Sequence, residues 1–137
     1  RFKKNKNLDL NRIKFMDGLS WEGYINHCGQ ASVLLDPLYF SAGNSFYESM
    51  FYGTPTVTKP TKYTKSRLVL GAYNQMEIQD APIVDKINDY VETAVAIANN
   101  KNLYDLKKYY NEKAKEKLYE NKLVIPDLEK IFIKLVS

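Results

Sequence analysis

The sequence predicts a three-layer α/β domain with a mostly parallel sheet, and three observations lead to this fold class. First, short apolar runs that suit strands alternate with helical patterns from residue 12 to about residue 84, and helical patterns finish the chain. Second, residues 32–35 are almost wholly apolar, as is typical of a parallel strand that is covered on both faces. Third, residues 36–59 lead from the end of that strand through a loop of small residues and a short helix into a returning strand.

Composition narrows the class of protein further. The length of 137 residues and a hydrophobic share of 45% suit one domain with its own core. Cys28 is the only cysteine, which rules out an intrachain disulfide and fits a reducing, cytoplasmic compartment. No apolar run has the length of a membrane span. The chain starts at Arg1 without a methionine, so we expect residues 1–137 to be a single-domain fragment of a longer protein.

The net charge of +4 suits an anionic ligand, although it specifies none. The lysines are dispersed among asparagine, tyrosine and glutamate without a recognition motif, which argues against a nucleic-acid surface. They are expected to form a solvated face.

The first elements are a short strand at residues 12–16 and a helix that Ser20 can cap. Four residues follow at i, i+3, i+4 and i+7, namely Trp21, Tyr24, Ile25 and Cys28. This spacing predicts one apolar helical stripe, most of which belongs to the core, and Gly29 ends the helix. His27 lies off the stripe and is expected at the surface.

The loop at residues 41–45 opens directly into a helix predicted at residues 46–52, which Gly53 ends. Free N–H groups and the positive end of the helix dipole make such a junction suitable for phosphate. Gly43 allows close approach of a ligand to the backbone, and Glu48 lies one turn into the helix. A purely structural interpretation is equally open, because Ser45-x-x-Glu48 has the spacing of a capping box.

The rest of the chain alternates loops with strands and helices. The pattern predicts a strand at 55–59, a polar loop at 60–65, a helix from Arg67 to Met76 capped by Ser66, a strand at 82–84, and helices at 87–99, 103–119 and 126–135. Pro126 suits a helix start, because its missing N–H has no partner there.

Three short motifs in this order resemble the donor half of a GT-B glycosyltransferase: L-D-P at 35–37, G-x-S-x-x-E at 43–48 and G-x-P-x-V at 53–57. The group that is most similar contains O-GlcNAc transferase and the bacterial cytoplasmic protein glucosyltransferases. The resemblance implies a Rossmann-like domain that forms the C-terminal part of a GT-B fold.

The resemblance also implies roles for individual residues. The loop residues Ser41, Gly43, Asn44 and Ser45 would hold the diphosphate of a nucleotide sugar, with a UDP-sugar as the expected donor, and Glu48 would bind the ribose hydroxyls. Tyr24 and His27 would lie near the base, although the family commonly has a histidine at the first position and a basic residue at the second. The family's Ser-Arg helix start places Arg67 near the donor. No metal is expected, because the chain has no D-x-D motif.

The function implied is donor binding for glycosyl transfer to a protein or glycan acceptor. Because a GT-B active site is a cleft between two halves, the fragment without its N-terminal half is expected to be inactive. Two alternatives stay open: a non-catalytic nucleotide-binding α/β module, and an interaction domain in which the capping box only caps.

Overall fold

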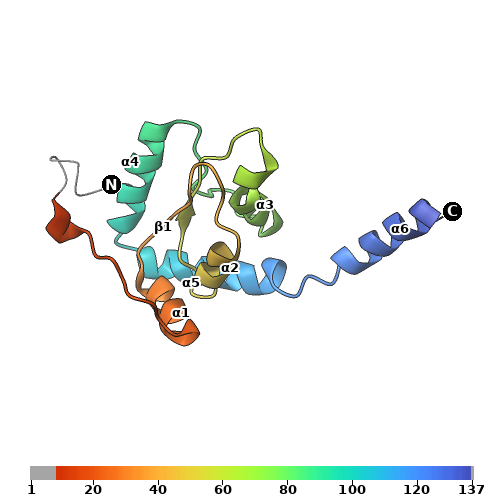
Figure 1. Ribbon diagram of the computed structural model, residues 1–137, viewed down its shortest axis with the longest axis horizontal. Helices are drawn as coiled ribbons and strands as arrows, with labels where there is room; N and C mark the ends of the chain where they lie inside the picture. The colour runs from red at the N-terminus through yellow and green to blue at the C-terminus, as the bar shows by residue number, and fades with distance from the viewer. Residues whose placement is uncertain (1–8, 137) are drawn as a thin grey trace.

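The computed structural model describes residues 9–136 and shows a mixed α/β fold that is mostly helical, with a small parallel sheet (Figure 1). In chain order the elements are η2 (Leu10–Arg12), α1 (Trp21–Gln30), β1 (Leu34–Leu35), α2 (Asn44–Met50), β2 (Thr56–Val57), η3 (Thr64–Ser66), α3 (Leu68–Gln75), α4 (Ile87–Ala98), α5 (Leu103–Lys113), η4 (Ala114–Leu118) and α6 (Val124–Val136). The elements η2 and η3 are 3₁₀ turns, and η4 is a π-helical turn that continues α5.

The sheet confirms the parallel pairing expected for the two central strands. Leu34 pairs with Thr56 and Leu35 pairs with Val57, in parallel register. A single parallel bridge between Thr58 and Ile83 adds the segment predicted as the last strand. The strands are shorter than the sequence pattern suggested.

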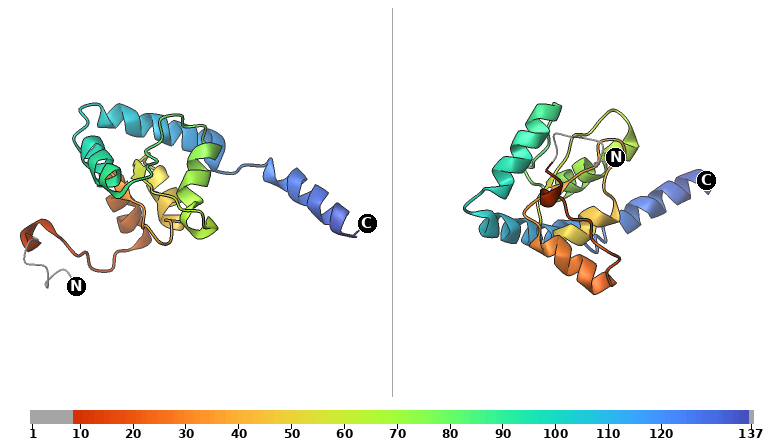
Figure 2. Two further views of the ribbon diagram at one scale, coloured as in Figure 1. Left: turned by 90° about the horizontal axis from the view of Figure 1, so that it is seen from above. Right: turned by 60° about the vertical axis from the view of Figure 1, so that its left-hand side comes forward.

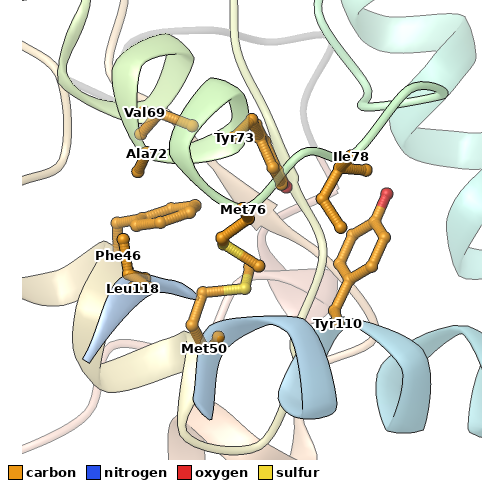
Figure 3. Packing of buried hydrophobic residues seen from close by; sticks show 10 residues of the cluster. Phe46, Met50, Val69, Ala72, Tyr73, Met76, Ile78, Tyr110 and Leu118 are labelled. Atoms are coloured by element: carbon orange, nitrogen blue, oxygen red, sulfur yellow. The ribbon is translucent and has the colours of Figure 1, made fainter. Parts of the chain in front are cut away.

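The hydrophobic core lies where α2, α3 and the α5–η4 helix meet (Figure 3). Phe46 of α2 packs edge to face against Tyr73 of α3, with 5.3 Å between the ring centroids. The Tyr73 hydroxyl donates to the Thr56 carbonyl at 3.0 Å and accepts from the Thr56 N–H at 2.8 Å. A fully buried phenol is therefore satisfied by β2, and the same two bonds fix α3 against the sheet.

Buried tyrosines make the fold sensitive to alkali. Burial raises the pKa of Tyr110 and Tyr119 to about 12, and burial together with the Asp36 charge does the same for Tyr90. Below the ordinary tyrosine pKa of 10.0 these phenols are protonated in both states, so they do not change the stability. Above it the unfolded chain releases protons that the fold retains, and stability falls as pH rises from about 10 to about 12.

We therefore expect helical circular dichroism to be lost in the same pH range in which tyrosinate absorbance appears. The variant Tyr110→Phe keeps the buried ring and removes one ionisable group, so its midpoint should move to higher pH. Ionisation of all tyrosines with the helical signal intact would contradict this prediction.

The strand predicted at residues 12–16 is wrong. Asp9 caps the 3₁₀ turn η2 through a 3.0 Å bond from the Asn11 N–H, and irregular chain follows as far as α1. A short apolar run becomes a strand only when a neighbour supplies hydrogen-bond partners. In the described chain no strand pairs with this run, and 73% of the Phe15 side chain is exposed.

Helix α1 confirms one expectation and corrects another. Ser20 caps it by accepting from the Gly23 N–H at 3.2 Å, as expected. Of the predicted apolar stripe, however, only Ile25 is buried, and Trp21 is 72% exposed. Trp21 and Ile25 instead line an open cavity beside α2.

The last helix, α6, extends away from the rest of the chain in every view (Figures 1 and 2). None of its residues is buried, although its sequence is strongly amphipathic. Within residues 9–136, no helix has both the length and the apolar character needed to cross a membrane.

Candidate functional site

The loop after β1 is tied to the sheet by one buried carboxylate. Asp36 is 2% exposed and accepts three hydrogen bonds: from the Ala42 N–H at 2.6 Å, the Ser41 hydroxyl at 3.0 Å and the Thr58 hydroxyl at 2.5 Å. From the other side, the Tyr90 hydroxyl donates to the Asp36 carbonyl at 2.8 Å. The carboxyl ends of both strands and helix α4 thus hold the loop in one position.

The far side of the loop rests on the segment that begins α3. The Ser41 N–H donates to the Lys65 carbonyl at 2.8 Å, and the Ser41 hydroxyl accepts from the Val69 N–H at 3.2 Å. Ser41 was expected to contact a diphosphate, but its hydroxyl is buried and fully used inside the protein. Its role in this structure is to position the loop.

The capping-box interpretation of the helix start is wrong. Helix α2 begins at Asn44, with Gly43 as its cap, and no side chain accepts a capping hydrogen bond from its first N–H groups. Ser45 is therefore the second residue of the helix, and it cannot act as the cap that a box with Glu48 requires. Within the described residues, the N–H groups of Gly43, Asn44 and Ser45 donate to no protein atom.

Gly43 is not required by the packing of the protein. A Cβ atom there would meet only the Leu68 Cδ1 atom, at 3.8 Å, which is an ordinary contact. Its backbone is not in the left-handed region either, with φ at −89°. The missing side chain leaves room over the open N–H groups.

Three of the predicted site residues come together between α1 and α2. The nearby Ser45 hydroxyl is the largest influence on the Tyr24 phenol and lowers its pKa. Burial, the neighbouring Cys28 thiol and the Glu48 carboxylate act in the opposite direction and make the net shift upward. Tyr24, Ser45 and Glu48 therefore lie within electrostatic reach of one another, beside the open N–H groups.

The other two predicted residues stand apart from this group. His27 is exposed on α1, and its side chain makes no hydrogen bond or ion pair with residues 9–136. Arg67 is exposed at the start of α3 and donates from Nη1 to the Thr61 carbonyl at 3.0 Å. Ser66, expected to cap α3, instead bonds within the preceding turn, where its hydroxyl accepts from the Thr61 N–H at 3.1 Å.

An apolar cavity of about 220 Å³ adjoins this group. It is lined by Trp21, Ile25, Tyr47, Glu48, Phe51 and Tyr119, and Glu48 is its only charged residue. The sequence analysis did not predict this cavity. It assigned Trp21 to the core and gave Phe51 no role beyond its place in the predicted helix. The i, i+4 spacing of Trp21 with Ile25, and of Tyr47 with Phe51, was the available signal.

Asp36 and Thr58 were missed as residues that position the site. The sequence did contain a signal, an aspartate placed directly after an apolar strand. A carboxylate buried there without hydrogen-bond donors would be costly, so donors from elsewhere in the chain were to be expected. The partners, however, come from positions five, six and twenty-two residues further along the chain.

The chain matches no protein-family model, and none of the curated proteins is similar enough to it to count as a relative.

Proposed function

We propose that this chain binds the nucleotide-sugar donor, with UDP-sugars as the first choice, as the C-terminal half of a cytoplasmic GT-B glycosyltransferase. The parallel strands would then belong to a three-layer, Rossmann-like domain. Ligands of such domains bind beyond the carboxyl ends of the strands, and the loop that Asp36 holds leaves the sheet at that end.

The observation that carries the proposal is the convergence of Tyr24, Ser45 and Glu48. They come from two helices, and they meet beside three consecutive N–H groups that have no protein partner within residues 9–136. Hydrogen-bond donors for phosphate and a carboxylate for hydroxyl groups are thus offered side by side. Because the capping box does not form, the Glu48 side chain does not cap the start of α2.

In this proposal the N–H groups of Gly43, Asn44 and Ser45 hold the diphosphate, and they stabilise the charge that develops on it as the sugar leaves. Glu48 accepts from the ribose hydroxyls, and Tyr24 and His27 flank the base. Arg67 supplies a positive charge at the edge of the loop, while Ser41 positions the loop through Asp36. The chemistry needs no metal in this scheme.

The acceptor, a protein or glycan, would be bound largely by the N-terminal half of the parent enzyme. Orientation of two reactants can account for roughly 7–11 kcal/mol of a barrier. The fragment alone is therefore expected to bind donor without transferring sugar. A nucleotide-binding module without catalysis is the alternative, and it makes the same binding prediction.

The test is a UDP titration of the fragment, followed through its backbone amide resonances. We expect shifts at residues 43–48 and at Tyr24, and we expect Glu48→Gln to weaken UDP about tenfold or more. A charge-assisted hydrogen bond is worth roughly 1.5–3 kcal/mol, and about 1.4 kcal/mol corresponds to a factor of ten. The free energy of unfolding should change by no more than about 0.5 kcal/mol, because Glu48 caps nothing.

The matched control is Glu92→Gln on α4, which removes the same charge from an exposed helix position. It should leave the affinity for UDP unchanged. If Glu48→Gln lowers stability and leaves UDP affinity intact, the carboxylate is structural and the proposed ribose contact is wrong.

A further inference from the structure

A second concave surface lies where the end of α1 and the turn after α2 meet the α5–η4 helix, and we call it the α5 groove. Its floor is formed by Gly29, Phe51 and Tyr52, and its wall by Tyr104, Lys108 and Lys115 of the α5–η4 helix. Its volume is about 530 Å³, within the range of ordinary ligand sites. Among residues 9–136, no acidic side chain lines it.

The floor is held rigidly by two further residues of α5. The Lys107 ammonium donates to the carbonyls of Gly29 and Ala31 at the end of α1, the latter at 3.0 Å. Asn111 donates through Nδ2 to the Phe51 carbonyl. These bonds join three segments that are far apart in sequence, so the groove is part of the folded structure.

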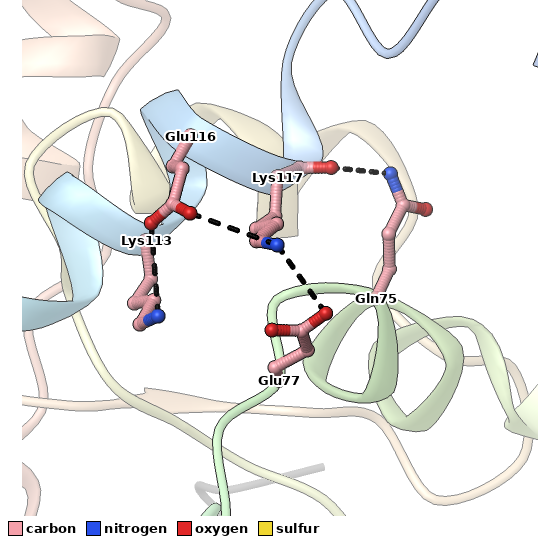
Figure 4. Close-up of polar contacts among 5 residues, drawn as sticks. All are labelled: Gln75, Glu77, Lys113, Glu116 and Lys117. Atoms are coloured by element: carbon pink, nitrogen blue, oxygen red, sulfur yellow. Dashed lines mark hydrogen bonds and ion pairs between the residues drawn. The ribbon is translucent and has the colours of Figure 1, made fainter. Parts of the chain in front are cut away.

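Apart from Lys107, the lysines of this helix fall into two groups. On one side, Lys113 pairs with Glu116 at 3.6 Å, and Lys117 pairs with Glu77 at 3.3 Å and with Glu116 (Figure 4). On the groove side, Lys108 and Lys115 make no ion pair with any residue between 9 and 136. The positive charge of the groove is therefore not neutralised within this part of the chain.

The spacing of Lys108 and Lys115 along the helix suits an extended ligand. Seven residues along a helix correspond to about 10 Å between Cα positions. An extended chain of the polyproline II type repeats every three residues and rises about 3.1 Å per residue. Its side chains at i and i+3 point the same way about 9 Å apart, which matches the lysine spacing.

The rings beside the lysines point to the same kind of ligand. Tyr104 is 80% exposed, and Phe51 and Tyr52 are also exposed at the groove. Aromatic rings next to ammonium groups suit a ligand that offers apolar side chains as well as carboxylates.

We propose that the α5 groove binds an extended acidic segment of another protein, with two carboxylates three residues apart and an apolar side chain between them. Lys108 and Lys115 pair with the carboxylates, and the apolar side chain packs on Tyr104 and Tyr52. This surface is separate from the proposed donor site and does not depend on it.

The test uses a fluorescent peptide with the sequence Gly-Glu-Pro-Phe-Glu-Gly and its counterpart with glutamine in place of both glutamates. The acidic peptide should shift the amide resonances of Tyr104, Lys108 and Lys115, and its binding should weaken as salt rises. The double variant Lys108→Ala/Lys115→Ala should weaken binding at least tenfold. Lys86→Ala/Lys122→Ala removes the same charge from exposed positions outside the groove and should leave binding unchanged.

Three outcomes would overturn the proposal. The neutral peptide could bind as tightly as the acidic one, or both double variants could weaken binding equally, which would show a diffuse charge effect. Inorganic phosphate could shift the groove amides while the peptide does not, which would identify a small-anion site. Thermal melting of both double variants checks that the fold is retained.

Discussion

The substitution Gly53→Ala should destabilise the protein by on the order of 3 kcal/mol. Gly53 has φ at +66°, where a residue with a Cβ atom costs about 1–2 kcal/mol. A Cβ atom would also lie 1.8 Å from the Lys107 carbonyl oxygen and 2.8 Å from the Asn111 nitrogen, both in the α5 backbone. Overpacking of this kind adds about 1–3 kcal/mol, because a helix backbone cannot rotate away as a side chain can.

This loss is a large share of the roughly 5–15 kcal/mol that stabilises a typical domain. Chemical denaturation of the variant measures it directly. The matched control is Gly71→Ala, on α3, where a Cβ atom would meet nothing within 4 Å. Alanine there should be neutral or stabilise by about 0.5–1 kcal/mol, since glycine inside a helix is unfavourable. Equal melting of Gly53→Ala and the parent protein would show that α5 does not press on this turn.

The substitution Asp36→Ala should cost on the order of 3 kcal/mol as well, and it should abolish UDP binding by releasing the loop. It leaves the Ala42 N–H and the hydroxyls of Ser41 and Thr58 without their acceptor in a buried place. Each unsatisfied buried donor costs about 1–3 kcal/mol. Rotation of the two hydroxyls to other acceptors reduces the sum, which is why the expected total is nearer the cost of one or two donors.

Two further variants show whether the loss of stability comes from the buried carboxylate of Asp36. Asp85→Ala removes a carboxylate from an exposed position and should change stability by less than about 0.5 kcal/mol. Asp36→Asn keeps one acceptor oxygen and should fall between the parent protein and Asp36→Ala. If Asp36→Ala unfolds no more easily than Asp85→Ala, the loop is held by contacts other than the carboxylate.

The parallel pairing of β1 with β2 could be predicted because it depends on local pattern. An apolar run, a short helix and a second run in 32–59 leave few alternatives once a crossover must connect parallel strands. The Ser20 cap follows from residue chemistry in the same way, and so does the turn after α2, where Gly53 has a positive φ. The prediction of a strand at 12–16 was wrong because no strand of the described residues pairs with this run.

The candidate site was predictable only in part, for the same physical reason. The sequence by itself determined that a small-residue loop would follow β1 and that Tyr24, Ser45 and Glu48 were worth examining. Only the tertiary structure decided that Ser41 turns inward to Asp36, that Gly43 replaces Ser45 as the cap, and that Lys108 and Lys115 share one groove. Hydrogen bonds and packing between residues tens of positions apart depend on how the helices meet, and periodicity along the chain carries no information about that.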